Sequence, residues 1–424
     1  MKKSDLKYQT YLKILQEELR PAMGCTEPIS LAYAAAVAKD LLGACPEKIL
    51  IQASGSIIKN VKSVIVPNTG HLKGIPAAVA AGIIAGDSSK ELEAIAKVSS
   101  AQIDAMQELL DTATFTVQHL ESPHTFDLIV TLFHDDSHAT VQITDDHTNI
   151  VFLQKDTKIL KDVRATDACE NSLSDRSLLN MEDIWDFTRT VDCRDVSELL
   201  DRQIAYNMAI ANEGLNNNYG ANIGKVLLSM GSDVRTKARA YAAAGSDARM
   251  NGCELPVIIN SGSGNQGMAT SIPVIVYAHE LAVTDEQLYR ALVLSNLTTI
   301  HQKTPIGRLS AYCGAVSAGA GAGAGIAYLH NGTYEDIIHT VVNAVSITSG
   351  IVCDGAKSSC AAKIAASVDA GILGFFMYRN GQQFYNGDGI VSNNIENTIR
   401  NVGQLASQGM KETNEEIIKI MINA

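Results

Sequence analysis

The stretch Phe126-Asp-Leu-Ile-Val-Thr-Leu-Phe133 decides the fold class, because large apolar side chains recur in it at every second residue. This spacing is typical of a β-strand with one buried face. Three further runs, at residues 114–119, 139–143 and 150–154, share its β-branched and aromatic composition and are separated by Asp, His, Ser and Asn turns. Together the four runs predict a mainly antiparallel meander.

On both sides of this meander the apolar spacing is mostly helical. Two more strands are predicted upstream, at Lys48–Ala53 and Lys62–Pro67, and one extended segment downstream, at residues 255–260. Helices before the meander are predicted at residues 5–20, 26–43, 74–86 and 89–111. Helices after it are predicted at residues 181–190, 195–214, 219–231, 236–249, 266–282, 285–299, 309–330, 333–350, 357–373, 390–406 and 412–423.

A polar segment at about residues 156–180 has no clear period and marks the predicted domain boundary. The sequence therefore predicts an α+β fold in which residues 1–165 form an α+β domain, with helices and a mainly antiparallel sheet. Residues 166–424 are expected to form a larger, all-helical domain. Within it, the alternating Gly and Ala of residues 319–325 lack the spacing of a phosphate-binding loop. We expect this run to form a helix packed closely against its neighbours.

Composition excludes several classes of function. The 424 residues are 46% hydrophobic and 19% charged, which is typical of a globular chain. With 34 Lys and Arg against 46 Asp and Glu, the formal charge is −12, so nucleic acid and anionic membranes are unfavourable partners. Eight cysteines are too few for a disulfide scaffold, and no apolar run of a signal peptide follows the N-terminus. We expect a cytoplasmic protein with reduced thiols and no membrane span.

Three cysteines in the last third of the chain, Cys313, Cys353 and Cys360, lie in tracts rich in Gly, Ala and Ser. Small neighbours leave room for a bulky group beside a thiolate, and an iron–sulfur cube is such a group. A cube held by three thiolates instead of four keeps one iron open to a substrate. Structural zinc normally shows closely spaced Cys pairs, which this sequence lacks. Three unrelated buried thiols are the alternative interpretation.

Cys25, within Ala22-Met-Gly-Cys-Thr-Glu-Pro28, is a candidate nucleophile or base. It directly precedes a predicted helix, whose backbone N–H groups and dipole favour a thiolate. Gly24 leaves the thiol uncovered, and the Gly and Pro around it indicate an unusual turn. The alternative is a buried cysteine that acts only as a small apolar residue.

The segment Asn260-Ser-Gly-Ser-Gly-Asn-Gln-Gly267 has glycines at the spacing of a dinucleotide-binding turn. Pro273 and the lack of a second predicted strand argue against that interpretation. A glycine-rich helix N-terminus can instead hold a smaller anion, such as a substrate carboxylate, with Asn265 and Gln266 as side-chain donors. A plain tight turn is the third interpretation.

The order of these motifs resembles the L-cysteine desulfidase family, which is related to the α chain of iron–sulfur L-serine dehydratases. The resemblance covers essentially the whole chain. The motifs that carry it are residues 24–28 (Gly-Cys-Thr-Glu-Pro), 246–253 (Ser-Asp-Ala-Arg-Met-Asn-Gly-Cys), 261–267 (Ser-Gly-Ser-Gly-Asn-Gln-Gly), and the three cysteines.

The resemblance implies a [4Fe–4S] cluster held by Cys313, Cys353 and Cys360. It also implies conversion of L-cysteine to pyruvate, ammonia and sulfide without pyridoxal phosphate, with Cys25 as the base for the α-proton. The open iron would act as a Lewis acid on the leaving group. The residues that the resemblance implies for the amino-acid pocket are Ser54, Lys59, Asn60, Ser261, Gly264, Asn265 and Gln266.

Other interpretations stay open on sequence alone. L-serine or another β-substituted amino acid can replace L-cysteine as the substrate. The same thiols can bind zinc in a structural or interaction protein, and the glycine motif can serve a nicotinamide-dependent oxidoreductase. The expected partner is a small amino acid, and a homodimer is one candidate assembly.

Overall fold

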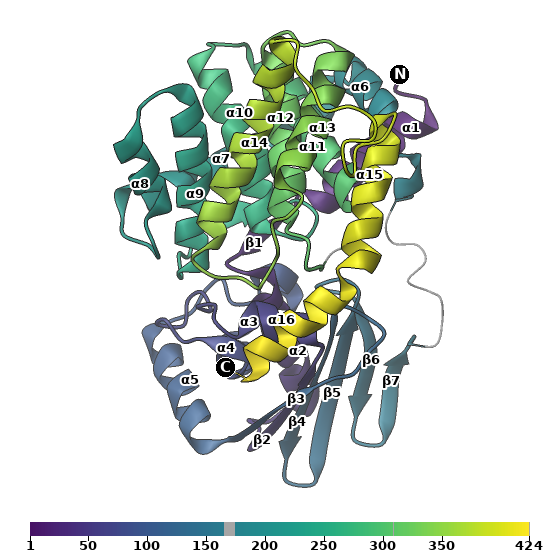
Figure 1. Cartoon of the computed structure of the whole chain (residues 1–424). Coiled ribbons are helices and arrows are strands. Elements are labelled where there is room, and N and C mark those ends of the chain that lie inside the picture. Colours follow the sequence, from purple (N-terminus) through teal and green to yellow (C-terminus); the bar gives the residue numbers. More distant parts are fainter. Residues whose placement is uncertain (165–173, 308, 424) are drawn as a thin grey trace.

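A six-stranded sheet and a bundle of helices occupy opposite ends of the computed structural model, which describes residues 1–164, 174–307 and 309–423 (Figure 1). We call residues 24–164 the sheet part and residues 174–404 the helical part. The α+β fold class predicted from the sequence is confirmed. The domain boundary predicted at residues 165/166 lies outside the described residues, so it stays a prediction.

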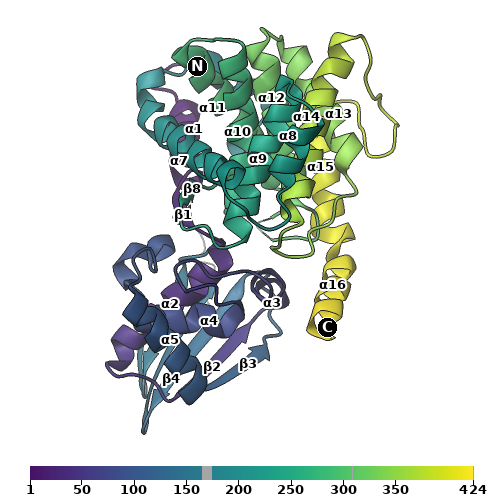
Figure 2. The same ribbon diagram turned by 90° about the vertical axis from the view of Figure 1, so that its left-hand side faces the viewer.

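The sheet has the strand order β3-β2-β4-β5-β6-β7, and α2 (Thr26–Leu42) packs across β4 and β5. Beside α2 lies α4 (Gly74–Ala85), and beside α4 lies α5 (Ser100–Thr112) (Figure 2). Neighbouring strands are antiparallel except β2 and β3, which pair in parallel. The strands are β2 (Lys48–Ala53), β3 (Thr114–His119), β4 (Asp127–His134), β5 (Ser137–Thr144), β6 (Ile150–Lys155) and β7 (Lys158–Asp162).

Three predictions for the sheet are wrong. β3 does not begin the meander but lies parallel to β2 at the sheet edge, because α3 (Gly55–Val61), α4 and α5 form the long crossover that parallel strands need. Residues 62–67 form no strand; one isolated bridge joins Ile65 to Lys73, and the alternating valines there are buried in a loop. β7, at the start of the predicted linker, has no apolar alternation in its sequence and is exposed along its whole length.

The helix predicted at residues 89–111 is two elements. A 3-10 helix, η1 (Ser88–Glu93), has Glu91 at φ +46°, which interrupts any continuous helix. α5 starts afresh after Ser99, whose hydroxyl accepts a hydrogen bond from the backbone N–H of Gln102 in a capping box.

The helical part agrees closely with the predicted helices, although α8, α12, α14 and α15 begin a few residues later than expected. Its extended segment is β8 (Pro256–Ile258), within the predicted run. Its helices are α6 (Met181–Thr190), α7 (Ser197–Asn216), α8 (Ile223–Met230), α9 (Val234–Met250), α10 (Gly264–Glu280), α11 (Asp285–Lys303), α12 (Gly314–Leu329), α13 (Tyr334–Thr348), α14 (Cys360–Arg379) and α15 (Ile395–Gln404).

α12 carries the Gly-Ala run and packs against α10, α11, α13 and α14. A Cβ at Gly319 would lie 2.2 Å from the carbonyl oxygen of Ser367, and one at Gly323 would lie 2.6 Å from that of Gly371, both in α14. A Cβ at Gly321 would collide with α11 in the same way. The glycines therefore let two neighbours approach the α12 backbone directly, as expected from the sequence.

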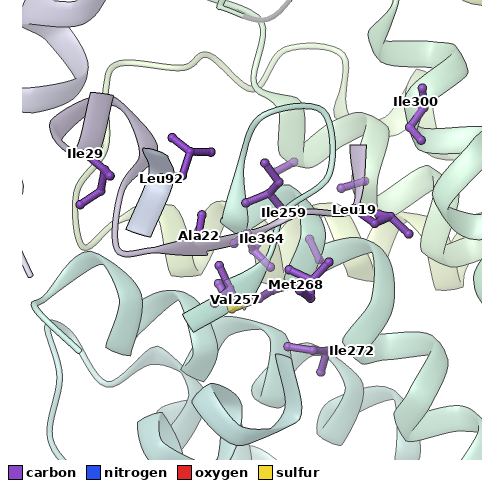
Figure 3. Close-up of a cluster of buried hydrophobic side chains, with 14 of the residues drawn as sticks. Leu19, Ala22, Ile29, Leu92, Val257, Ile259, Met268, Ile272, Ile300 and Ile364 are labelled. Carbon is purple, nitrogen blue, oxygen red and sulfur yellow. The ribbon is translucent and has the colours of Figure 1, made fainter. Parts of the chain in front are cut away.

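The buried core is continuous across the two parts. One cluster of buried residues includes Ile29 of the sheet part and Ile259 of the helical part, and Figure 3 shows Ala22, which precedes the sheet part, near Val257. Ile364 in the same view belongs to α14, the one helix among the described residues that is long and apolar enough to cross a membrane. Since 56% of that stretch is buried inside the protein, α14 serves here as a core helix.

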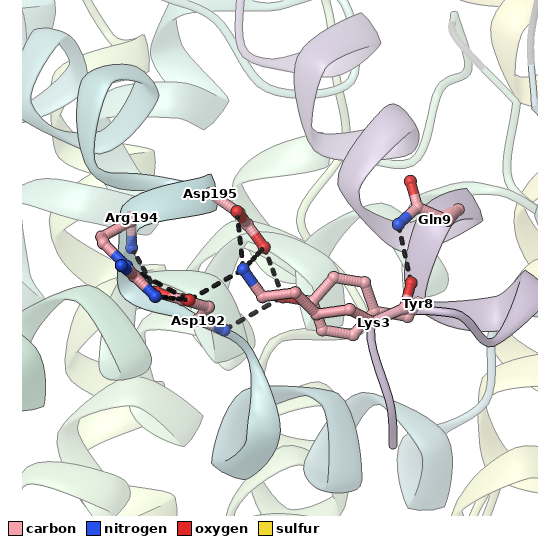
Figure 4. Close-up of polar contacts among 6 residues, drawn as sticks. All are labelled: Lys3, Tyr8, Gln9, Asp192, Arg194 and Asp195. Carbon is pink, nitrogen blue, oxygen red and sulfur yellow. Dashed lines mark hydrogen bonds and ion pairs between the residues drawn. The ribbon is translucent and has the colours of Figure 1, made fainter.

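The N-terminal segment precedes the sheet in sequence but packs against the helical part. The rings of Tyr8 and Tyr11 in α1 (Leu6–Glu18) lie 5.1 and 5.4 Å from the ring of Phe187. The ammonium group of Lys3 pairs with the carboxylates of Asp192 and Asp195 (Figure 4). β1 (Pro21–Met23) then pairs antiparallel with β8.

The last described helix, α16 (Lys411–Asn423), crosses in the opposite direction and packs against α3 (Figure 1). Lys59 Nζ donates to Asn414 Oδ1 at 2.7 Å, and Lys62 Nζ donates to the carbonyl oxygen of Met421. A Cβ at Gly55 would lie only 2.7 Å from the side chain of Ile418, so the two helices are in close contact.

Candidate active site

A cavity between the two parts is lined by side chains from both. We call Cys25, Glu27, Asn60 and His147 the sheet wall of this cavity. The opposite side, the helical wall, includes Arg249, Ser261, Ser263, Asn265, Gln266, Lys303, Tyr312, Cys313, Cys353, Cys360 and Lys363. The structure therefore places Cys25, the three candidate cluster cysteines and four of the predicted pocket residues around one space.

Four helices begin at this cavity. Cys25 is the N-cap of α2, Ser263 that of α10 and Cys313 that of α12, and Cys360 is the first residue of α14. The first turn of each helix has backbone N–H groups without intrahelical partners, and the helix dipole adds partial positive charge there. Four such ends favour anionic contents, such as thiolates or a carboxylate.

The three cysteines of the helical wall come from two short segments that pair with each other. Cys313 N–H donates to the carbonyl oxygen of Ile351 at 3.1 Å, and Cys353 N–H donates to that of Ala311 at 2.6 Å. Burial and the neighbouring Cys353 raise the pKa of the Cys313 thiol to about 12, and burial raises the pKa of Cys360. Thiolates held this close repel one another, so a cationic group is needed to keep all three deprotonated.

This donor set fits an iron–sulfur cluster better than a single zinc ion. Three thiols face one space near two helix N-termini, and thiolates are the usual ligands of such clusters. Among residues 1–164, 174–307 and 309–423, no three His, Cys, Asp or Glu side chains are grouped to hold one metal ion. None of the seven cysteines in these ranges forms a disulfide.

The sheet wall is a hydrogen-bonded network around Glu27. Cys25 Sγ donates to Glu27 Oε2 at 3.1 Å, and Asn60 Nδ2 donates to Oε1 at 2.9 Å. The hydroxyl of Thr26 lies 3.1 Å from Oε2 and also 3.1 Å from the carbonyl oxygen of Gly262, so it can donate to either. All four side chains are buried, which fixes the thiol of Cys25 in one orientation.

The expectation that Cys25 is a thiolate is wrong for the free protein. Its position at a helix N-terminus predicts a thiolate, but burial and the negative charge of Glu27 raise the pKa of Cys25 well above its ordinary value. Burial alone would raise the pKa of Glu27, yet His147, the hydrogen bond from Cys25 and Arg249 together lower it. In the free protein Cys25 is therefore a thiol that donates to a carboxylate.

Several polar atoms of the helical wall have no hydrogen-bond partner in the protein. They are Arg249 Nε, Asn265 Oδ1, Gln266 Oε1 and Tyr312 Oη. The arginine is 3% exposed, the glutamine 6% and the tyrosine 1%. Since buried polar groups are nearly always paired, these atoms indicate a site for a polar ligand.

Three predicted pocket residues lie outside the cavity lining. The hydroxyl of Ser54 donates to the carbonyl oxygen of Thr125 at 2.9 Å, at the start of α3. Lys59 Nζ donates to the carbonyl oxygen of Cys353 at 3.2 Å and to Asn414 of α16. Gly264 provides room, because a Cβ there would lie 2.4 Å from Arg249 Nε.

The glycine motif at residues 260–267 is not built as a dinucleotide site. β8, which precedes it, pairs antiparallel with β1 in a two-stranded sheet, whereas a dinucleotide turn belongs to a parallel βαβ unit. The motif instead opens α10, the arrangement expected for a smaller anion.

Glu27, His147 and Arg249 line the cavity but are absent from the residues proposed for it on sequence alone. Glu27 is two residues after Cys25, where an acidic residue also serves the helix dipole, so its second role was hidden. Arg249 lies within a motif, residues 246–253, whose chemistry the spacing does not reveal. His147 comes from a turn between β5 and β6, and no local pattern links it to Cys25.

Comparison with known proteins places the chain in a family. Residues 89–419 match the family described as the serine dehydratase alpha chain. A UPF0597 protein of Desulfitobacterium hafniense (strain Y51) is 59% identical over 424 residues, covering 100% of this chain and 99% of that protein. UPF0597 proteins of Lachnoclostridium phytofermentans and Treponema denticola are 49% and 45% identical, each over 98% of this chain and over 100% and 98% of their own lengths.

The matched region contains the glycine motif and all three cysteines of the helical wall, and it supports a lyase-type enzyme. The chain belongs to the serine dehydratase alpha chain family, in agreement with the resemblance of its motifs.

Proposed function

We propose that this protein is an iron–sulfur-dependent lyase that eliminates sulfide from L-cysteine and so yields pyruvate and ammonia. The observation that carries the proposal is one cavity, lined by three thiols on one wall and by the Cys25–Glu27 pair on the other. Family membership supports the lyase class, and the choice of L-cysteine over L-serine is our own inference.

In this proposal Cys313, Cys353 and Cys360 hold a [4Fe–4S] cluster at the N-termini of α12 and α14. The cluster supplies Lewis-acid stabilisation of the leaving group. The helix N-termini and the ammonium group of Lys363, which pairs with Asp354 beside Cys353, lower the cost of placing three thiolates together.

The sheet wall is proposed to bind the substrate ammonium group and to move one proton. Burial, and after it the charge of Glu27, raise the pKa of Cys25, and an ammonium group that enters beside Glu27 offsets the second of these causes. The hydrogen bond to Glu27 orients the thiol of Cys25. The thiol then loses its proton to water in the cavity, and the resulting thiolate takes the α-proton. Asn60 keeps the Glu27 carboxylate in place through its 2.9 Å hydrogen bond.

The elimination balances as follows. The Cα–H bond of the substrate breaks as its proton passes to Cys25, and the Cβ–S bond breaks as the electron pair leaves with the sulfide. The 2-aminoacrylate formed tautomerises, and water releases pyruvate and ammonia. With L-serine the same steps release water instead of sulfide, which makes serine dehydration the second candidate activity, favoured by the family match.

Anaerobically purified protein, reconstituted with iron and sulfide, tests the proposal. We expect four iron atoms per cluster, broad visible absorbance, and sulfide and pyruvate produced in equal amounts from L-cysteine. Pyruvate from L-serine at a higher kcat/KM would assign the second activity. A colourless protein that binds one zinc ion tightly and forms no pyruvate from either amino acid would refute both.

A further inference from the structure

The geometry points to Arg249, together with the N-terminus of α10, as the site that binds the α-carboxylate of the substrate. This inference rests on the proposed amino-acid substrate and names the residue that would select for a free carboxylate.

Arg249 is a buried cation without a close ion-pair partner among the described residues. It is the penultimate residue of α9, is 3% exposed and lines the cavity. Its Nε has no hydrogen-bond partner, and its guanidinium group makes no ion pair within the described residues. Burying an unpaired guanidinium is unfavourable unless a ligand supplies the opposite charge.

The other charged groups of the cavity donate or accept elsewhere. Glu27 interacts with Arg249 through its charge, which lowers the pKa of Glu27, but no hydrogen bond joins the two. The oxygens of Glu27 accept from the side chains of Cys25 and Asn60. The remaining lining lysines have their own acceptors, since Lys363 pairs with Asp354 and Lys303 donates to the carbonyl oxygen of Gly307.

The first turn of α10 lies directly against the same guanidinium. A Cβ at Gly264 would be 2.4 Å from Arg249 Nε and 2.9 Å from its Cζ, so only glycine permits this contact. α10 is 17 residues long, and its free backbone N–H groups begin at Gly264. A planar guanidinium beside such a helix end provides a forked set of donors that matches a carboxylate.

Two amide side chains in this turn also line the cavity. Gln266 Oε1 and Asn265 Oδ1 have no hydrogen-bond partner in the protein, and as acceptors they suit the ammonium group of an amino acid, whereas Arg249 and the backbone N–H groups suit its carboxylate. The Gln266 amide lies against Gly314, where an added Cβ would be 2.5 Å from Gln266 Cδ. This contact places the amide next to Cys313, so a carboxylate held by Arg249 would lie between the α10 N-terminus and the thiols.

The motif at residues 246–253 supports this assignment, because Arg249 is its only member in the cavity lining. Asp247 instead accepts a hydrogen bond from the N–H of Gly224, and Asn251 accepts one from the hydroxyl of Ser358. These contacts anchor the end of α9 to α8 and to the segment that carries Cys360, and thereby fix where the guanidinium lies.

Binding of L-alanine, which has no β leaving group, tests the assignment by calorimetry on the reconstituted full chain. We expect Arg249→Gln to weaken L-alanine binding by about 10- to 100-fold, and Arg249→Lys to weaken it less. Arg239→Gln is the matched control, because Arg239 is also in α9 but pairs with Asp369. Iron and sulfide contents should be equal in all variants. Unchanged L-alanine binding in Arg249→Gln would overturn the assignment.

A second measurement needs no variant, so it remains decisive even if Arg249→Gln does not fold. L-alaninamide keeps the ammonium group but lacks the carboxylate, and we expect wild-type protein to bind it at least about 10-fold more weakly than L-alanine. Equal binding of the two ligands would overturn the inference.

The inference and the proposed function fail in different ways. Arg249-dependent L-alanine binding in a protein without lyase activity would support the inference and refute the function. An active lyase whose KM is unchanged in Arg249→Gln would do the reverse.

Discussion

The sheet wall of the cavity and its helical wall differ in how their polar atoms are satisfied. Glu27 accepts hydrogen bonds from Cys25 and Asn60, so the sheet wall is complete within the protein. The helical wall leaves Arg249 Nε and Gln266 Oε1 without partners and holds thiols close together. A network whose polar atoms are all paired fixes one proton in position, whereas unpaired donors, acceptors and thiols require a ligand. In the proposed function the first wall binds the ammonium group and moves the proton, and the second holds the cluster and the carboxylate.

The largest expected effect comes from breaking the helical wall. Cys353→Ser removes one of three thiolates, and a serine hydroxyl is a poor ligand for iron, so we expect loss of the cluster and of lyase activity down to background. Iron and sulfide analysis and the visible spectrum measure this loss. Cys45→Ser, which alters an exposed thiol of the sheet part, is the control and should change neither. A Cys353→Ser protein with full iron content would remove this residue from the ligand set.

A substitution in the sheet wall should leave the cluster in place and slow only the proton transfer. In Cys25→Ser we expect an intact visible spectrum but a rate of α-proton exchange with solvent reduced by about 10²- to 10⁴-fold, because the base is missing. Proton NMR of the substrate in D₂O follows the exchange. Exchange at the wild-type rate would mean that another residue is the base.

A third change tests the scaffold behind the helical wall. Gly319→Ala places a Cβ only 2.2 Å from the carbonyl oxygen of Ser367, so α12 and α14 must move apart. We expect the free energy of unfolding to fall by about 1–3 kcal/mol, measured by urea unfolding under anaerobic conditions. Gly350→Ala is the matched control, because a Cβ there meets no atom within 4 Å. Equal stability of the two variants would show that the helices tolerate the methyl group.

The smallest effect is expected for the link between the two walls. Lys59 Nζ joins α3 to Cys353 and Asn414, but burial lowers its pKa and so offsets part of what these contacts contribute. Lys59→Met should therefore cost only about 1 kcal/mol of unfolding free energy, with surface Lys13→Met as the control. A loss of several times that amount would show that the contacts of Lys59 contribute much more to the stability of the fold than this reasoning allows.

The helices could be predicted closely because each carries its own apolar spacing and local end signals. The ladder of β4, β5 and β6 could be predicted for the same reason. The position of β3 could not, since its pairing with β2 depends on the three helices between them. The valines at residues 64 and 66 imitate a strand because a buried loop also needs apolar side chains.

In the candidate site too, some residues could be predicted from the sequence and others could not. Unusual small-residue surroundings made Cys313, Cys353 and Cys360 visible in the sequence, and a Gly–Pro turn did so for Cys25. The charge environment of Cys25 was not visible, because it depends on Glu27 and Arg249 at distances that only the fold sets. Lys59 illustrates the reverse case, a predicted pocket residue that does not line the cavity and instead links α3 to Cys353 and α16.

The passage of α16 back to α3 has a consequence for how the protein is made. Chains emerge from the ribosome N-terminal end first, so α3 is available long before residues 411–423 have been synthesised. Until then Lys59 and the face of α3 around Gly55 have no α16 to pack against. In the proposed function, cluster insertion therefore has an interval in which all three cysteines have been translated but α16 does not yet pack against α3.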